Sequence, residues 1–539
     1  MIQHPTLHIL ALLVILIITY KKNDVIFKIV ALSIPVISAV SIYFLPQCNF
    51  IHLYNLTLIY DGGTYNKLIG IAFSIILLSA NLYAIGQNKK LDLILGNAYG
   101  GFSLLCLFAR DFISVFVALE LMMIFSSMII FIGGERSSIR SAKKYFLTHL
   151  LSSNMIIIGV VYLITKGQGV ELVSVTPLVE DPEYSSFILY IMLAGLLINI
   201  AIFPFSGWMV NNYPTASGSG FLYLISFTTK VSILLLVKLF AGYEPLIYIA
   251  ITMIIYASIK AIFEDNLMSL LCLLSIIVMG VMLAAIGKGG TDMIEVVIYY
   301  LFIHVIYKML LSVSVVSIVD STGIKNCSEL RKVNSNIVLS ALLIGIIIMM
   351  NIPMTSSFYM KSYISNAFLG NAVYFVTLFS SFMIAFSLPW KHYLVSKKYI
   401  EINLNIYCKL SIVLMSLVTI VIGLFGKKIF EMISDVTFNI SNIDMLKQII
   451  VILIALGIST HYSISRIHTK PVNLIEKVGS LLFYFYTRSL SIKVKEKKHS
   501  LFSNLDDKIT KKLSSAHNQQ TAIFIVFTIF IIILMILEI

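Results

Sequence analysis

The stretch LLINIAIFPFSGWMVNNYPTASGSGFLYLISFTTK, from Leu196 to Lys230, joins two hydrophobic segments through an uncharged middle. That middle, Pro204 to Gly220, holds two prolines, three glycines and two asparagines, so it cannot form one continuous helix. In a membrane, such backbone must be packed inside protein, line a watery cavity or lie at the surface. Lys230 falls about eleven residues into the next apolar segment, near the middle of a helix that needs roughly 20 residues to cross. A buried lysine there indicates a function.

The composition predicts a polytopic membrane protein. Of 539 residues, 59% are hydrophobic and 12% are charged, against about 25% charged in soluble domains, and the mean hydropathy is +0.95. The apolar segments recur almost without pause, which favours one helical bundle. The net charge of +13 comes from basic residues that cluster between the apolar segments, which indicates membrane topology and not nucleic-acid binding.

The five cysteines show no metal or redox spacing, so we expect neither a metal nor a cofactor. The first apolar segment, about Leu7 to Tyr20, lacks a basic region before it and is followed by many more. It is therefore expected to be a transmembrane helix and not a cleaved signal.

Hydropathy predicts sixteen transmembrane helices. They are expected at 6–20, 26–45, 68–87, 92–109, 112–133, 145–165, 187–204, 219–241, 245–263, 268–287, 294–319, 336–360, 371–390, 408–426, 447–464 and 521–538. With this count, nearly all basic loops fall on one side, which the positive-inside rule identifies as the cytoplasm, and both termini lie outside. Lys427 and Lys428 are the exceptions.

Several ionisable residues lie inside predicted spans, where charge is expensive and usually functional. Glu120 is the single charge of its span, although a protonated, hydrogen-bonded acid would also fit there. His304 and Lys308 are four residues apart, hence on one helix face. A histidine alone would more often be a packing residue, but beside Lys308 it suits a proton relay. Lys361 follows an interruption at Pro353, and transporters place ion sites at such helix breaks. The alternative is a lysine at a helix end whose side chain snorkels to the membrane interface. Lys260 lies near a helix end and is better explained by snorkelling to the interface.

These residues stand in motifs that resemble, in order, the antiporter-like membrane subunits shared by Mrp-type cation/proton antiporters and respiratory complex I. The motifs are FVALE with Glu120, RSAKKYFLTHLL, FPFSGW followed by Lys230, HVIYK, and IPMTSSFYMK ending at Lys361. By length and loop pattern, the D-type subunit of Mrp antiporters is the nearest fit. The resemblance implies two inverted repeats, each with a broken helix. It also implies a proton path in which Glu120 tunes a lysine, Lys230 and the His304–Lys308 pair carry protons, and Lys361 is the exit.

The chain departs from the family where the first repeat should carry its lysine, because Asn199 occupies that position. An asparagine can hydrogen-bond but cannot carry a proton, so the partner that Glu120 should tune is missing. The FPFSGW region also lacks a family histidine and proline, and Asn266, Met268 and Ser269 replace a charged motif.

The resemblance also suggests a division of the chain. Residues 1–90 are N-terminal helices, 91–365 the proton-translocation core, 366–464 further helices, 465–520 a basic segment and 521–539 a final helix. Segment 465–520 holds eleven Lys or Arg against four acids. It is expected either to lie along the headgroups or to be a solvated cytoplasmic loop.

Three functions remain open. The first is an antiporter subunit similar to the Mrp D-type, which still conducts protons in exchange for Na⁺ or K⁺. The second is a non-conducting structural paralogue, and the third is a membrane subunit of a complex I-like NADH–quinone oxidoreductase. All three imply other membrane subunits as partners and the bacterial plasma (inner) membrane as the location. An independent enzymatic activity is not expected.

Overall fold

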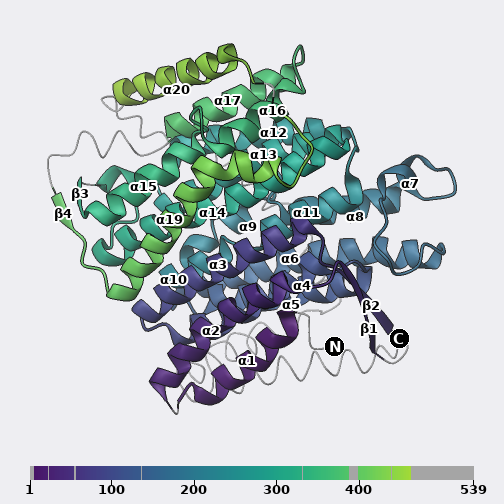
Figure 1. Cartoon of the computed structure of the whole chain (residues 1–539), viewed down its shortest axis with the longest axis horizontal. Coiled ribbons are helices and arrows are strands. Elements are labelled where there is room, and N and C mark those ends of the chain that lie inside the picture. Colours follow the sequence, from purple (N-terminus) through teal and green to yellow (C-terminus); the bar gives the residue numbers. More distant parts are fainter. Residues whose placement is uncertain are drawn as a thin grey trace, which may run out of the picture. The chain divides into compact units, whose positions relative to one another are not determined.

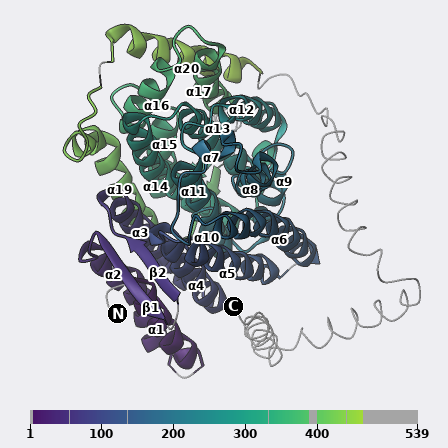
Figure 2. The ribbon, with the colours of Figure 1, turned by 90° about the vertical axis from the view of Figure 1, so that its right-hand side faces the viewer.

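The computed structural model describes residues 5–21, 23–53, 56–134, 136–330, 332–387, 399–438 and 440–462. These residues belong to one of the two compact units of the chain, residues 1–471. The predicted basic segment 465–520 and final helix 521–539 lie outside the described residues. Figures 1 and 2 place α1 and α2 at one end of the described bundle and α20 at the other, where it packs against α17.

The described residues are almost entirely helical, and eleven of their helices are long and apolar enough to cross a membrane. The helices are α1 (Pro5–Thr19), α2 (Asp24–Tyr43), α3 (Thr64–Gly86), α4 (Lys90–Phe108), α5 (Phe112–Phe131), α6 (Arg136–Thr165), α7 (Thr176–Glu180), α8 (Ser186–Asn199), α9 (Gly207–Val210), η1 (Tyr213–Thr215), α10 (Gly218–Leu224), α11 (Thr228–Phe240), α12 (Pro245–Phe263), α13 (Leu267–Lys288), α14 (Thr291–Thr322), η2 (Cys327–Glu329), α15 (Asn336–Met349), α16 (Ser356–Asn366), α17 (Ala372–Ser387), α19 (Ile406–Glu431) and α20 (Asn442–Tyr462). Two short sheets join β1 (Cys48–Leu53) to β2 (Leu56–Asp61), antiparallel, and β3 (Lys332–Asn334) to β4 (Tyr399–Glu401), parallel. The chain is a polytopic membrane protein, as predicted.

Several predicted helix ends differ from those observed, as at α6, which begins at Arg136, and two of the differences bear on the candidate site. The span predicted at 187–204 ends at Asn199, because Ala201 has a φ of 63° and its amide bonds back to Ile198 O. A right-handed helix cannot continue through that conformation. The span predicted at 219–241 is broken between α10 and α11, at residues 225–227. The interruption predicted near Pro353 is confirmed, since it separates α15 from α16.

The uncharged linker from Pro204 to Gly220 is packed inside the protein. Trp208, Met209 and Val210 are buried, and Trp208 Nε1 donates to Ile198 O at 2.8 Å. That bond ties the short helix α9 to the end of α8. Of the three environments predicted for this linker, the protein interior is the one observed.

The helices form two sets of equal order and similar length. Helices α4, α5, α6 and α8 have 19, 20, 30 and 14 residues. Helices α12, α13, α14 and α15 have 19, 22, 32 and 14 residues. In both sets each helix packs against the next one. The core of the chain is therefore an internal repeat.

The repeats also share the turn that ends their fourth helix. After α8, Ala201 has a φ of 63° and its amide donates to Ile198 O at 3.0 Å. After α15, Asn351 has a φ of 57° and its amide donates to Ile348 O at 3.1 Å. Counted from the start of the first repeat, five spans precede α12, namely α4, α5, α6, α8 and α10–α11. Because five is an odd number, an alternating topology inverts the second repeat relative to the first.

Contacts between loops support the predicted alternation of sides. The loops expected outside bond to one another through their backbones: Arg110 N to Ile59 O at 2.8 Å, Phe112 N to Val170 O at 2.8 Å, Leu172 N to Arg110 O at 2.9 Å and Gly242 N to Ile286 O at 2.9 Å. The segments expected inside are joined to one another by side-chain and backbone bonds: Ser138 Oγ to Thr215 O at 2.6 Å, Tyr83 OH to Asp320 Oδ2 at 3.0 Å and Leu267 N to Lys325 O at 2.9 Å. The assignment of the second set to the cytoplasm stays a prediction.

Candidate functional site

Lys230 lies just after the break between α10 and α11. Its side chain is fully buried, and its Nζ donates to Ile225 O at 2.5 Å. The break makes this carbonyl available, because residues 225–227 leave the helical hydrogen-bond ladder. Broken membrane helices expose backbone groups in this way where they hold ions.

Lys230 lies near the middle of α14, the long helix of the second repeat. Lys308 is close enough to Lys230 for their charges to interact, and His304 lies within range of both. His304 and Lys308 are both buried. Their spacing of four residues places them on one face of α14, as predicted. Within the described residues, His304 Nε2 and Lys308 Nζ have no hydrogen-bond partner. We call Lys230, His304 and Lys308 the central basic cluster.

The central basic cluster places like charges together where water is excluded. Like charges repel more strongly in such surroundings than in water, so a proton on one member opposes a proton on its neighbour. His304 Nδ1 is held by Tyr307 OH at 2.9 Å, which leaves Nε2 to exchange a proton. The arrangement can pass a single proton between neighbouring basic groups.

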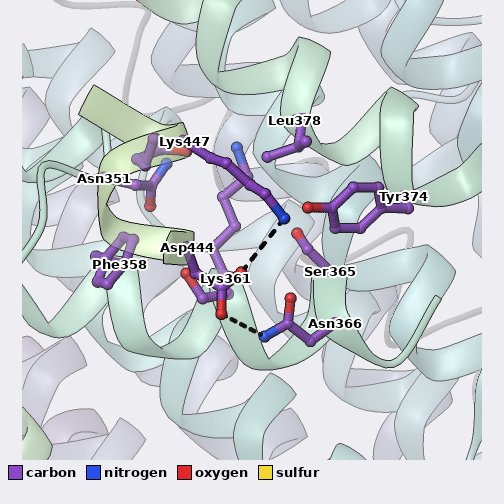
Figure 3. A pocket seen from close by; sticks show the side chains of 11 residues that line it. Asn351, Phe358, Lys361, Ser365, Asn366, Tyr374, Leu378, Asp444 and Lys447 are labelled. Atoms are coloured by element: carbon purple, nitrogen blue, oxygen red, sulfur yellow. Dashed lines mark hydrogen bonds and ion pairs between the residues drawn. The ribbon is translucent and has the colours of Figure 1, made fainter. Parts of the chain in front are cut away.

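A cavity lies beyond the cluster, at the break between α15 and α16. Tyr300, one turn before His304, donates to Asn351 Oδ1 at 3.4 Å, and Asn351 lines this cavity. Figure 3 shows Lys361 among its lining side chains, with Asp444 and Lys447 of α20. The volume of about 20 Å³ is enough for one water molecule.

Lys361 is buried and donates to Ser381 Oγ of α17. Gln448 Nε2 of α20 donates to the same hydroxyl at 3.0 Å and to Met350 O at 3.1 Å. Lys361 is therefore connected to the end of the bundle that α20 covers. Sequence reasoning missed Ser381 and Gln448, because neither is charged and they come from different helices.

Glu120 lies on α5 and is half-buried. Its carboxyl group lies close to the side chain of Ser153 on the neighbouring helix α6. Asn199, the last residue of α8, also contacts α6, because its Oδ1 lies 2.8 Å from Ser152 Oγ. Glu120 and Asn199 thus face the same part of α6 from two sides.

His149 occupies that part of α6, and sequence reasoning did not select it. Its Nδ1 lies 2.9 Å from Asn199 Oδ1. Its ring packs on Tyr145 at 4.3 Å and on Trp208 at 4.5 Å between centroids. A lone histidine in an apolar helix gives no signal by itself, and its partner is 50 residues away in the chain.

The site is thus a series of side chains that can hold or pass protons, running from α5 and α6 through α11 and α14 to α16, α17 and α20. Lys260 stands apart from it, half-buried in the last turn of α12. Within the described residues, no group of three His, Cys, Asp or Glu side chains could hold a metal ion.

Comparison with known proteins shows which family shares this sequence and architecture. The family described as "NADH:quinone oxidoreductase/Mrp antiporter, TM" matches residues 109–387. An N-type subunit of the NADH-quinone oxidoreductase of Thermodesulfovibrio yellowstonii is 26% identical over 312 residues, covering 54% of this chain and 66% of that protein. The D-type subunit of the Na⁺/H⁺ antiporter of Bacillus subtilis is 24% identical over 228 residues, covering 40% of this chain and 46% of that protein. The chain thus spans about two thirds of the first relative and less than half of the second.

The fold is shared with a chain in the structure of the membrane-bound sulfane sulfur reductase, an archaeal respiratory membrane complex. The TM-score is 0.71 at 14% identity, and the alignment covers 83% of this chain and 98% of that chain. At such low identity the likeness shows the fold alone. The family match spans more than half of the sequence and contains both helix breaks and the central basic cluster. The chain therefore belongs to the transmembrane family shared by NADH:quinone oxidoreductases and Mrp antiporters.

Proposed function

We propose that the chain is an ion-translocating subunit of a multisubunit monovalent cation/proton antiporter, similar to the D-type subunit of Mrp antiporters. Protons pass along Lys230, His304 and Lys308 and leave through Lys361, while Glu120 acts at the other end of the series. The exchanged cation is Na⁺ or K⁺, the partners are other membrane subunits, and the location is the bacterial plasma membrane.

The central basic cluster is the observation that carries this proposal. It places three buried, titratable side chains beside a helix break, at the junction of two repeats. Burying such groups costs free energy that packing alone does not require. Two of the three have a nitrogen free of hydrogen bonds within the described chain, which suits proton exchange.

The second candidate is a proton-pumping membrane subunit of a complex I-like oxidoreductase. Its support is the resemblance to the N-type subunit of the Thermodesulfovibrio enzyme, which extends over more of the chain than the match to the Bacillus antiporter. Purification of the native complex separates the two. Small antiporter subunits would accompany the first function, and quinone-site and iron–sulfur subunits the second.

The first prediction concerns proton flux in vesicles that carry the whole assembled complex. A Na⁺ or K⁺ pulse should move protons in the native complex, and Lys230→Ala should reduce this movement to background, because the central basic cluster then lacks its first member. A pH-sensitive dye inside the vesicles reports the flux.

Lys260→Ala is the matched control, since it removes a lysine from a helix end outside the series and should leave the flux unchanged. Native flux in an assembled Lys230→Ala complex would contradict the relay. It would favour the remaining alternative, a structural subunit that does not conduct.

A further inference from the structure

The two repeats carry a histidine at the same place. His149 of α6 and His304 of α14 each stand thirteen residues after the first residue of their helices, Arg136 and Thr291. Both rings are buried, and both have Nε2 without a hydrogen-bond partner in the described chain. His304 belongs to the central basic cluster, so its counterpart in the first repeat invites the same question.

His149 also touches the residue that departs from the family. Asn199 replaces the expected lysine, and its side chain, 4% exposed, accepts from His149 Nδ1 at 2.9 Å. His149 is itself 4% exposed. A titratable ring therefore lies one hydrogen bond from the position at which the resemblance places a titratable amine.

We propose that His149 is the proton-carrying residue of the first repeat and that Asn199 is its positioning residue. This inference rests on the proposed proton relay and adds its missing first member. With Nδ1–H donated to Asn199 Oδ1, the lone pair of Nε2 accepts a proton to give the imidazolium ion. The same Nε2–H bond then breaks to release the proton, and the amide neither gains nor loses one.

The surroundings of His149 fit this role. Glu120 of α5 lies close to Ser153, which is one turn from His149 on the same face of α6. The phenol of Tyr145, on α6, packs on the ring, and the phenol of Tyr213, on η1, packs on Tyr145 and Trp208 behind it. Helices α8 and α9 add no charged side chain to this site.

The ring is held in one orientation from three sides. Asn199 fixes Nδ1, Tyr145 covers one part of the ring and Trp208 covers another. The hydroxyl of Ser152 lies 2.8 Å from both Asn199 Oδ1 and Gly195 O, so it can hold the amide in place. Such support is what a proton-transfer group needs, because transfer depends on geometry before it depends on affinity.

The test uses vesicles of the whole complex and records cation-driven proton flux against pH. His149→Gln keeps a hydrogen-bonding side chain but cannot carry the proton, and it should lower flux by about 100-fold, the lower end of what a positioned proton-transfer group supplies. His149→Gln combined with Asn199→Lys should recover flux, because a titratable group returns to the site. Thr148→Ala is the control and should behave as the native chain, since the Thr148 hydroxyl donates only to Lys144 O of its own helix.

Asn199→Asp tests the positioning role without removing the histidine. A carboxylate against the ring favours the charged imidazole, so the pH profile of flux should move to higher pH. If His149→Gln prevents assembly, this profile alone decides, and an unshifted one overturns the proposal.

Failure of this inference differs from failure of the proposed function. If His149→Gln assembles with native flux and an unchanged pH profile while Lys230→Ala abolishes flux, His149 is only a packing residue and the relay begins at Lys230. If both variants conduct normally, the proposed function itself is wrong.

Discussion

At the scale of single residues, the hydroxyl of Ser381 joins three helices, because it accepts hydrogen bonds from both Lys361 and Gln448. Ser381→Ala leaves Lys361 Nζ without this acceptor and Gln448 Nε2 with Met350 O alone, which should lower the free energy of unfolding by about 1–3 kcal/mol. The neighbouring Ser380→Ala should cost less, because that hydroxyl donates to Thr377 O in its own helix. Thermal unfolding of the purified complex, followed by intrinsic fluorescence, compares them, and equal melting temperatures would show that the Ser381 contact contributes nothing.

The charged members of the site could be predicted from the sequence, whereas their neutral partners could not. Glu120, Lys230 and Lys361 were visible because a charge inside an apolar span is rare. His149 was not, since its counterpart position in α14 becomes apparent only when both helix starts are known. Ser381 is likewise an ordinary helix serine until Lys361 and Gln448 are found to share its hydroxyl.

At the scale of helices, hydropathy predicted the existence of spans well and their ends poorly. Every span predicted within the described residues corresponds to an apolar helix, and eleven of these are long enough to cross a membrane. The end of α8 was placed five residues late because Ile200 to Phe203 are apolar and carry no stop signal, whereas the turn at Ala201 depends on backbone conformation. Hairpin β1–β2 was not predicted, because its pairing with the loop before α5 is a tertiary contact.

The close contact of α6 with α8 is a property of these helices that can be tested. A Cβ atom on Gly195 would stand 2.7 Å from the backbone oxygen of Ser152, so any side chain there pushes α6 and α8 apart. Gly195→Val should therefore cost about 1–3 kcal/mol by overpacking and lower proton flux by separating His149 from Asn199.

The control for this helix contact is Gly457→Ala in α20, where an added Cβ meets no atom of the described residues within 4 Å. It should change neither the melting temperature nor the flux. Normal flux and stability in an assembled Gly195→Val complex would argue against any role for the α6–α8 contact.

At the scale of the whole molecule, the sequence predicts that successive loops lie on alternating sides of the membrane. The internal repeat is consistent with this topology. The resemblance implied two inverted repeats, and the matched lengths of α4–α8 and α12–α15 agree with that implication. The register of basic loops could be predicted because charge near span ends orients the chain. The contacts among loops could not, since they join residues far apart in sequence.

Labelling from either side of the membrane tests this topology. In a Cys48→Ser background, the cysteines of the described helices are buried. Lys89→Cys, in the exposed loop before α4, should react with an impermeant maleimide only in inside-out vesicles. Lys166→Cys, in the exposed loop after α6, should react only in right-side-out cells or spheroplasts. Labelling of both from one side would refute the alternation.

The backbone bonds between the loops on the expected outer face limit how this protein can change in evolution. Loops normally accept insertions and deletions more readily than helices do. Here Arg110 bonds through its backbone to both Ile59 and Leu172, so one added residue beside it would disturb three loops at once. That face should keep its loop lengths as strictly as the helices keep theirs, and new sequence should accumulate elsewhere along the chain.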